Sequence, residues 1–540
     1  MKQLIKISLS IIFFSTLLLG QTGCESFLDQ QPLTDLSENA FWENESHAML
    51  ALTGLYEKST VGLNGYNNEL LIRGSMTDDS GFKHGSVGVI YSGYVREGDG
   101  QIVTGIWNRS YTTIFKTNYF LENIDRVEMD ASKKAEFIAE ARFLRAYEYF
   151  YLSTFYGYVP LITQVLTIEE ANTQTQTSQK EIQEFAIQEL TEVALDLPAE
   201  RPSDEKGRIL RAAAYGIKGR MLMTQKKWSD AAIAFKAAMD LGVHIIDPRF
   251  KELFIESGED SKENILVTNC ISGLYPNVQS QLNFHVEFYG GYSEVYLYQN
   301  FIDDFPMIDG MPIDESPLYD PEKPFDNRDP RLYASVMLPN YTEFRGEIYD
   351  PSLELSGLVG STGYGYQKVL DEDYEGSLNS AGNDIIHMRY SEILLSYLES
   401  KLEAGDNITQ DLLDETINKV RGRESVNIGF VTETDPAKLR RIVRTERRIE
   451  FSQEGLGFIR WWDIRRWGEY VERVNKKFYG MKLTDDPENY TKHPVEKTGK
   501  YRGHKIVLDK TGSISSKYEL LPIPIFEINI NPTLQQNPGY

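Results

Sequence analysis

Three loop-rich stretches of the chain combine aromatic side chains with carboxylate, arginine or histidine. The first, residues 77–101, offers Asp78, Asp79, Tyr91, Tyr94 and Arg96. The second, residues 283–298, offers His285, Phe288, Tyr289, Tyr292 and Tyr296, and a third places Tyr364 and Tyr366 among glycines. An aromatic ring presents a flat apolar face, and polar groups beside it supply hydrogen bonds. We therefore expect a surface that binds a ligand with flat C–H faces and hydroxyl edges.

The usual signatures of catalysis are missing from the sequence. It contains no His-Glu-x-x-His zinc motif, no Gly-x-Ser-x-Gly nucleophile motif and no Walker A loop. The seven histidines lack metal-ligand spacing, and residues 371–376 resemble a calcium loop only faintly, because the closing glutamate is out of register. We expect a binding protein without catalytic residues, cofactor or metal.

Cys24 has the surroundings of a lipidation site. A basic N-terminus is followed by the apolar run 7–20 and by a small residue, Gly23, directly before the cysteine. This order is typical of a bacterial lipoprotein signal, and a run of about 14 residues is short of the roughly 20 that span a bilayer. We expect residues 1–23 to be a signal peptide and Cys24 to carry the lipid anchor. Gln21 departs from the pattern, since an aliphatic residue is usual there.

Composition narrows the class of protein further. A net charge of −24 argues against nucleic acid as a partner, because phosphate neutralisation needs clustered lysine and arginine. Only two cysteines occur, so a lipidated Cys24 leaves no intramolecular disulfide. Cys270 stands in a strand-like run and is expected to be a small buried residue. Tyrosine, with 32 residues, outnumbers phenylalanine, with 26, and many tyrosines lie in loops suited to contact surfaces.

Helical periodicity dominates the elements that must position these loops. Helices are predicted within 46–58, 107–156, 179–197, 211–241, 384–404, 410–421 and 436–474. Long loop-rich stretches separate them, and such loops inside a compact body are usually functional. Tyr298 and Phe301 are expected to open a further helix into the core, and Trp107 to join the core together with Tyr111 and Ile114.

One helix pair has the spacing of a repeat. Trp228, Ala231, Phe235 and Ala238 lie on one helical face, and the preceding helix carries Ala214, Gly216 and Gly219. Large aromatic residues that alternate with small ones let two antiparallel helices approach closely, as in tetratricopeptide repeats.

Residues 444–468 concentrate arginine and tryptophan. Taken alone, this composition suggests an anion site. However, Glu446, Glu450, Glu454 and Asp463 stand at helical distances from the arginines and would neutralise them. Arginine stems also pack well on tryptophan faces. The segment therefore predicts a charge-paired helix that docks into the core.

The order of these motifs resembles the SusD/RagB outer-membrane lipoproteins. The resemblance rests on residues 24–32, 40–42, 54–56, 140–150, 156–161, 329–331, 389–395, 418–421, 446–468, 522–524 and 536–540. Each motif is weak alone, but they occur in order along the whole chain. The chain is therefore identified as a member of this family.

The resemblance implies a fold and a function. It implies one mainly α body after the signal peptide, with a tetratricopeptide-like helix-pair scaffold in 24–245 and binding loops with closing helices in 246–540. It further implies a lipid-anchored protein of the outer membrane, facing the exterior, that captures oligosaccharide and closes over a SusC-like TonB-dependent transporter. Family ligand sites are loop aromatics that diverge, so the site residues named above come from their chemistry.

Three alternatives stay open at this point. A RagB-like lid would bind peptides, gripping them more through backbone hydrogen bonds than through ring stacking. A surface glycoside hydrolase needs two carboxyl groups about 5–10 Å apart, and such a pair leaves no short motif. An adaptor that uses only its helical face for protein partners would leave the loop aromatics buried.

Overall fold

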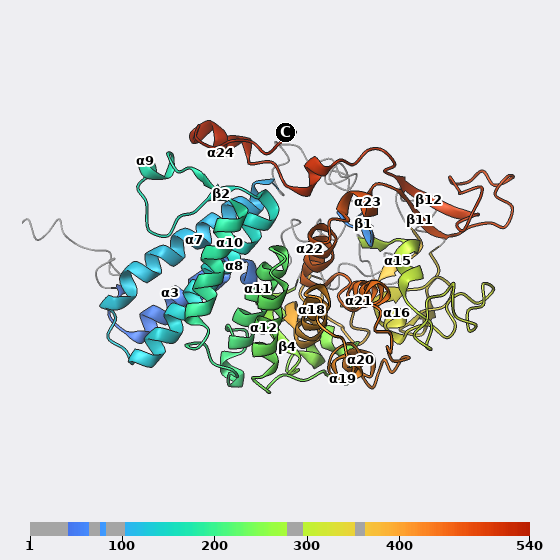
Figure 1. Ribbon diagram of the computed structural model, residues 1–540, viewed down its shortest axis with the longest axis horizontal. Coiled ribbons are helices and arrows are strands. Elements are labelled where there is room, and N and C mark those ends of the chain that lie inside the picture. Colours follow the sequence, from blue (N-terminus) through green and yellow to red (C-terminus); the bar gives the residue numbers. More distant parts are fainter. Residues whose placement is uncertain (1–40, 64–75, 83–102, 278–294, 352–361, 378) are drawn as a thin grey trace, which may run out of the picture.

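The computed structural model describes residues 41–540 except 64–75, 83–102, 278–294, 352–361 and 378. The chain is mainly α-helical with a few short strands, as the sequence predicts. In Figure 1 the helices of the N-terminal half lie side by side at one end of an elongated body. The helices α18, α21 and α22 occupy its middle, and short helices, strands and loops form the other end.

The helices of the N-terminal half agree closely with the predicted ranges, except for the short α9, which was not predicted. They are α3 (Glu45–Lys58), α7 (Gly105–Asn123), α8 (Ala131–Tyr156), α9 (Ile168–Ala171), α10 (Gln179–Val193), α11 (Arg211–Thr224) and α12 (Trp228–Met239). Polar caps set their starts: Asp130 accepts hydrogen bonds from the first backbone N–H groups of α8, and Ser178 and Glu181 form a reciprocal capping box at α10.

The helices of the C-terminal half are shorter. They are α15 (Gln299–Asp304), α16 (Pro330–Ser335), α18 (Tyr390–Glu403), α19 (Gln410–Glu415), α20 (Ile417–Arg421), α21 (Pro436–Glu450), α22 (Phe458–Arg466), α23 (Tyr470–Val474) and α24 (Ile525–Ile530). The stretch 436–474, predicted to be helical, holds three helices, with breaks after Glu450 and after Arg466. Within the described ranges, no helix combines the length and apolar character needed to cross a membrane.

Twelve short strands are described, and all of their pairings are antiparallel. They are β1 (Ser80–Phe82), β2 (Val159–Pro160), β3 (Gln176–Thr177), β4 (Asn264–Thr268), β5 (Val295–Leu297), β6 (Val336–Met337), β7 (Glu343–Phe344), β8 (Glu347–Ile348), β9 (Gly365–Tyr366), β10 (Ile385–Arg389), β11 (Lys477–Lys482) and β12 (His504–Asp509). One sheet has four strands, in the order β1-β5-β9-β6, and the other sheets are pairs.

The predicted helix 384–404 is wrong over its first residues. Ile385–Arg389 is strand β10, which pairs with β4, and α18 begins only at Tyr390. Every residue of β10 is buried. A partner strand more than a hundred residues earlier decides this segment, and local periodicity carries no trace of it.

The core confirms several expectations. Tyr298 and Phe301 are fully buried at the start of α15, and Trp107 is buried against Tyr111 with ring centroids 4.9 Å apart. Cys270 is 4% exposed just beyond β4, and burial raises the pKa of its thiol. It is therefore an unreactive core residue at neutral pH.

The predicted close helix pair is α11 and α12. Ala231, Phe235 and Ala238 are buried on the inner face of α12. A Cβ atom at Gly219 of α11 would stand 2.4 Å from the ring of Phe235. Glycine is therefore needed at that position for the two helices to approach, as the repeat spacing predicts.

The arginine-rich segment docks into the core as predicted, but most of its partners are distant in sequence. Glu446 and Glu450 of α21 both bind Nη1 of Arg331 at 2.7 Å, and Nη1 of Arg389 lies 2.6 Å from Glu450 Oε1. Arg331 and Arg389 are fully buried. Neutralisation within one helix is thus wrong for these two glutamates, because carboxylates of α21 balance arginines of α16 and β10.

Asp463 fits the prediction better. It accepts hydrogen bonds from Arg466 of its own helix and pairs with Arg447 of α21 at 2.9 Å. Arg466 also stacks on Trp462, with the guanidinium carbon 4.5 Å from the ring centroid.

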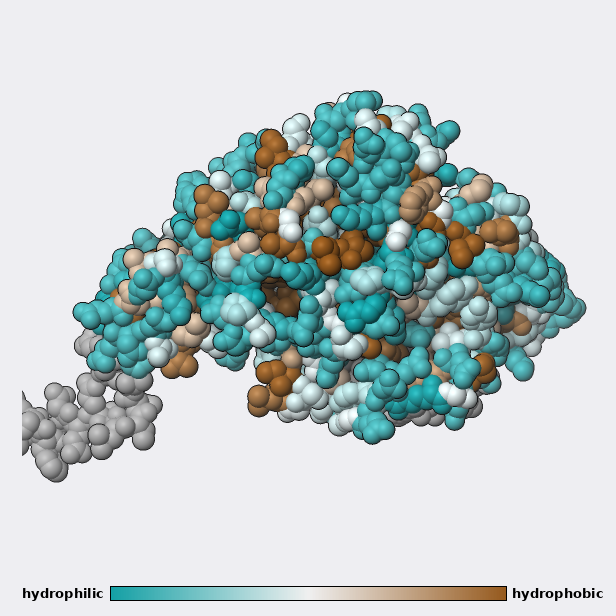
Figure 2. Space-filling model, turned by 90° about the horizontal axis from the view of Figure 1, so that it is seen from below, coloured by the Kyte–Doolittle hydropathy of each residue, from teal (hydrophilic) through white to brown (hydrophobic). Residues whose placement is uncertain are grey.

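One face of the molecule is mostly polar. Seen from below, hydrophilic residues cover most of the face, and hydrophobic residues form separate clusters and the floor of a hollow near its middle (Figure 2). The net charge of −24 agrees with such a surface.

Candidate functional site

The four-stranded sheet joins the described parts of all three predicted stretches. Phe82 of β1 is the register partner of Val295 of β5, and Tyr296 is the partner of Gly365 of β9. Residues near 80, 296 and 365 thus lie side by side although they are far apart in sequence. A Cβ atom at Gly81 would stand 2.3 Å from the Tyr296 ring, so the strands approach closely there.

Seven of the predicted ligand-binding residues lie outside the described residues. They are Tyr91, Tyr94, Arg96, His285, Phe288, Tyr289 and Tyr292. Their role stays a prediction.

Asp78 and Asp79 lie just before β1 and connect the start of this strand to the helices α21 and α22. Both are fully buried. Arg460 of α22 donates two hydrogen bonds of 2.9 Å to the Asp78 carboxylate, and Arg448 of α21 donates one of 2.7 Å to Asp79 Oδ1. These carboxylates are engaged in ion pairs inside the protein, so they reach a ligand only if those pairs open.

The two carboxyl groups differ in electrostatics. Burial opposes ionisation, but the guanidinium groups of Arg448 and Arg460 hold the pKa of Asp78 well below its usual range. Burial raises the pKa of Asp79, whose Oδ2 has no hydrogen-bond partner among the described residues. Of the two carboxylates, Asp78 therefore makes the stronger ion pair, through its bidentate contact with Arg460 of α22.

The described tyrosines of the prediction are covered by protein. Tyr296, Tyr364 and Tyr366 are 7%, 4% and 6% exposed. Tyr296 packs edge-on against Tyr298, with centroids 5.9 Å apart, and burial raises the pKa of Tyr296 to about 12. Stacking against a ligand would require their neighbours to move, and their binding role stays a prediction.

A groove that sequence reasoning missed lies beside this cluster. Its volume is about 760 Å³. It runs along the outer face of α21, and the loops that follow α15 and α20 form its other walls. The lining includes Asp303, Asp304, Asp309, Met311, Phe430, Glu433, Lys438, Arg441, Thr445 and Lys500.

Contacts at one end connect the groove to the sheet. Asp304 forms an ion pair with Arg448, the residue that binds Asp79. Its neighbour Asp303 accepts a hydrogen bond of 3.1 Å from the Tyr501 hydroxyl and pairs with Lys500 at 2.8 Å. The start of β1 and the groove are therefore connected through one network of ion pairs.

The groove has the chemistry expected of the site. The Phe430 side chain is 58% exposed. Charged side chains of both signs line the same groove, among them the exposed pair of Arg441 and Glu315 at 3.1 Å. An exposed ring in a groove that also offers donors and acceptors suits a hydroxyl-rich ligand. The spacing of Lys438, Arg441 and Thr445, three and four residues apart, was the available sequence signal for this outer face.

Metal chemistry finds no support in the described part of the chain. Among those residues, no group of three or more histidine, cysteine, aspartate or glutamate side chains is placed to hold an ion.

Two family models match the chain. The model described as "SusD family" matches residues 251–540, and the one described as "Starch-binding associating with outer membrane" matches residues 26–223. The second description associates the family with the outer membrane.

Relatives cover almost the whole chain. The SusD-like protein P25 of Formosa agariphila is 22% identical over 98% of this chain and 99% of its own. A crystal structure of a SusD-like carbohydrate binding protein from Bacteroides fragilis is 36% identical, covers 92% of this chain and 100% of its own, and has a TM-score of 0.83. A laminarin binding SusD-like protein shares the fold at 20% identity, with the same coverage and a TM-score of 0.68. The chain belongs to the SusD family.

Proposed function

We propose that this protein captures oligosaccharides at the cell surface and acts as the lid of a SusC-like TonB-dependent transporter, without cleaving its ligand. The observation that carries the proposal is the sheet β1-β5-β9-β6, which joins the described parts of three separate aromatic-rich stretches. A ligand longer than one sugar ring needs contacts from several segments, and the sheet brings three of them together.

The groove along α21 supports an extended ligand. Its volume of about 760 Å³ exceeds what one sugar unit fills, and the Phe430 side chain in it is exposed. Relatives point the same way, since the Bacteroides fragilis protein is described as carbohydrate binding and another family member as laminarin binding.

Anchoring belongs to the same proposal. The lipid on Cys24 would hold the mature protein at the outer membrane beside its transporter, facing the exterior. Two or more acyl chains give stable attachment where one chain gives only marginal binding. A Cys24→Ser variant is expected to leave the membrane fraction of cells, and its retention there would contradict lipid anchoring.

The test is a binding screen of residues 25–540 against panels of polysaccharides and peptides, with product analysis for cleavage. We expect saturable binding of at least one glycan and no shortened product. Tight peptide binding without glycan binding would support the peptide lid, and glycan cleavage would support the glycosidase.

A matched pair of variants locates the site. Phe430→Ala removes a ring that is 58% exposed in the groove, and Phe115→Ala removes one that is 52% exposed on α7. Loss of one stacking ring is expected to weaken glycan binding about tenfold. Phe115→Ala is expected to leave the affinity unchanged, and equal effects of both variants would contradict the assignment of the groove.

A further inference from the structure

The groove along α21 contains more carboxylates than cations. Of the lining residues that the structure describes, four carry a positive charge and six carry a negative one. The excess has the same sign as the net charge of the whole chain, −24. A ligand with negative charges therefore approaches a groove of its own sign.

Each of the four cations already has a carboxylate partner. The pairs are Arg421 with Glu446 (2.7 Å), Lys438 with Glu433 (3.4 Å), Arg441 with Glu315 (3.1 Å) and Lys500 with Asp303 (2.8 Å). The last three cations are exposed, and exposed ion pairs are weak, so an anion can compete for them. However, an anion that takes Arg441 leaves Glu315 unpaired beside it, and like charges side by side lower the affinity.

Two carboxylates of the loop after α15 have no cation beside them. Within the described chain, no lysine or arginine forms an ion pair with Asp309 or Asp314. Asp309 accepts hydrogen bonds from Ser316 Oγ at 2.7 Å and from the backbone N–H of Met311 at 3.0 Å. Asp314 is exposed to solvent. Carboxylate oxygens accept hydrogen bonds from hydroxyl groups, so these two aspartates suit a sugar and repel an acid.

An uncharged sugar finds partners without breaking any ion pair. The side chains of Phe430 and Met311 are exposed in the groove and offer apolar contact to C–H faces. An ammonium such as that of Lys438 has three N–H donors, and its pair with Glu433 engages only some of them. Hydroxyl groups can therefore bind both signs of charge in the groove.

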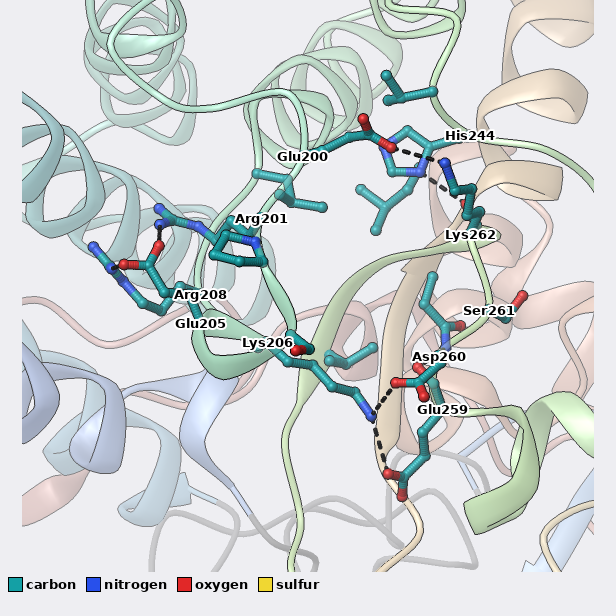
Figure 3. A pocket seen from close by; sticks show the side chains of 18 of the residues that line it. Glu200, Arg201, Glu205, Lys206, Arg208, His244, Glu259, Asp260, Ser261 and Lys262 are labelled. Carbon is teal, nitrogen blue, oxygen red and sulfur yellow. Dashed lines mark hydrogen bonds and ion pairs between the residues drawn. The ribbon is translucent and has the colours of Figure 1, made fainter.

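A separate cavity of about 330 Å³, between residues 199–210 and 259–267, gives an anion no better position. Its two arginines pair with Glu136 of α8. The pairs across it, drawn in Figure 3, are Lys206 with Glu259 (3.0 Å) and Lys262 with Glu200 (2.9 Å). An anionic glycan would meet the same competition there as in the groove, so binding to the whole protein reports the same preference.

We propose that the groove along α21 selects uncharged glycans and rejects those that carry carboxylate or sulfate groups. This selectivity rests on the proposed function, because it belongs to the same groove, and it adds the class of glycan. It comes from a cost to the wrong ligand, since a captured cation leaves its carboxylate unpaired and Asp309 and Asp314 already lack a cation.

Calorimetric titration of residues 25–540 with two groups of polysaccharides tests the class. The uncharged group is laminarin, amylopectin, galactomannan and methyl-esterified homogalacturonan, and the anionic group is polygalacturonate, alginate and chondroitin sulfate. We expect the tightest binding from an uncharged glycan, at least about tenfold tighter than any anionic one. An anionic glycan that binds as tightly would overturn the selectivity and leave glycan capture standing. Binding of no glycan would contradict the proposed function, and the selectivity with it.

Two double variants locate the cause. Glu315→Gln with Glu433→Gln releases two cations in the groove. Glu184→Gln with Asp240→Asn makes the same change of charge on the N-terminal helices, where these residues pair with lysines. The groove variant is expected to reduce the affinity ratio between the best uncharged and the best anionic glycan about fivefold, and the control is expected to leave it unchanged. Thermal melting establishes that both are folded. Equal changes in both variants, or none in either, would overturn the assignment to the groove.

Salt distinguishes repulsion from attraction in the wild-type protein. Screening relieves the repulsion between like charges, so added sodium chloride is expected to leave the uncharged glycan's affinity unchanged and to strengthen residual binding of polygalacturonate. Binding of polygalacturonate that weakens with salt would show that cations attract it, and would overturn the selectivity.

Discussion

The helix pair α11 and α12 and the centre of the C-terminal half are held together in opposite ways. Between the two helices, small residues let aromatic ones approach, as Gly219 does for Phe235. In the C-terminal half, buried arginines and carboxylates from several short segments meet around Arg389. Because α11 and α12 follow one another in the chain, their packing depends on residues that are close in sequence. The ionic centre joins segments that local sequence does not bring together.

The ionic centre also explains why the family motifs occur where they do. Arg389 binds Glu263, Glu450 and Glu454, and Arg331 binds Asp329 and Glu446. Apart from Glu263, these residues come from three of the motifs, 329–331, 389–395 and 446–468. These three motifs supply one to three members each of a single buried network, and the network fixes the position of α21, whose outer face lines the groove.

The largest effect is expected from breaking this network. Arg389→Ala leaves three buried carboxylates without their shared partner and is expected to cost about 3–5 kcal/mol in the free energy of unfolding. Urea unfolding measures it. A loss below about 1 kcal/mol would mean that the network does not hold the C-terminal half together.

The second largest effect is expected from acid, which should lower the stability of the C-terminal half. Burial opposes ionisation of Glu399, yet the Arg466 guanidinium lowers its pKa from 4.5 to about 2. Because the folded pKa lies below the unfolded one, this stability is present above about pH 4.5 and is lost as the pH falls towards 2. The contribution is up to about 3 kcal/mol. Glu399→Gln should flatten the melting temperature across this range, whereas Glu192→Gln on the surface of α10 should not.

Adding volume between α11 and α12 tests how closely the helices of the N-terminal half are packed. Gly219→Ala places a Cβ atom 2.4 Å from the Phe235 ring and is expected to destabilise the protein by about 1–3 kcal/mol. The matched control is Gly54→Ala in α3, where nothing lies within 4 Å of the added atom. The control is expected to gain about 0.5–1 kcal/mol. Opposite signs in thermal melts support the packing account, and equal shifts would contradict it.

The smallest effect is expected from an exposed pair. Arg441 and Glu315 are 68% and 48% exposed in their side chains. Arg441→Ala is expected to change the free energy of unfolding by less than about 1 kcal/mol. The comparison with Arg389→Ala then isolates burial as the cause of the difference between two arginine ion pairs, and similar losses in both variants would refute it.

Sequence and structure agree where the decisive contacts are local. The N-terminal helices follow from periodicity, and the close approach at Gly219 follows from spacing. Strand β10 and the partners of Glu446 and Glu450 were missed, because their contacts come from distant segments. The same cause limited how much of the binding site could be predicted from the sequence. Aromatic content marked the stretches that the sheet joins, but the burial of Tyr296, Tyr364 and Tyr366 depends on pairing between them.

The central claim is that the loops and the α21 groove bind glycan while the N-terminal helices serve as scaffold. Hydrogen–deuterium exchange with and without the glycan that binds most tightly in the screen tests it directly. The account predicts that protection appears in residues 303–315 and 430–445 and in the segments that flank β1 and β5. Protection confined to the helices between 131 and 239, with none in the groove, would contradict it.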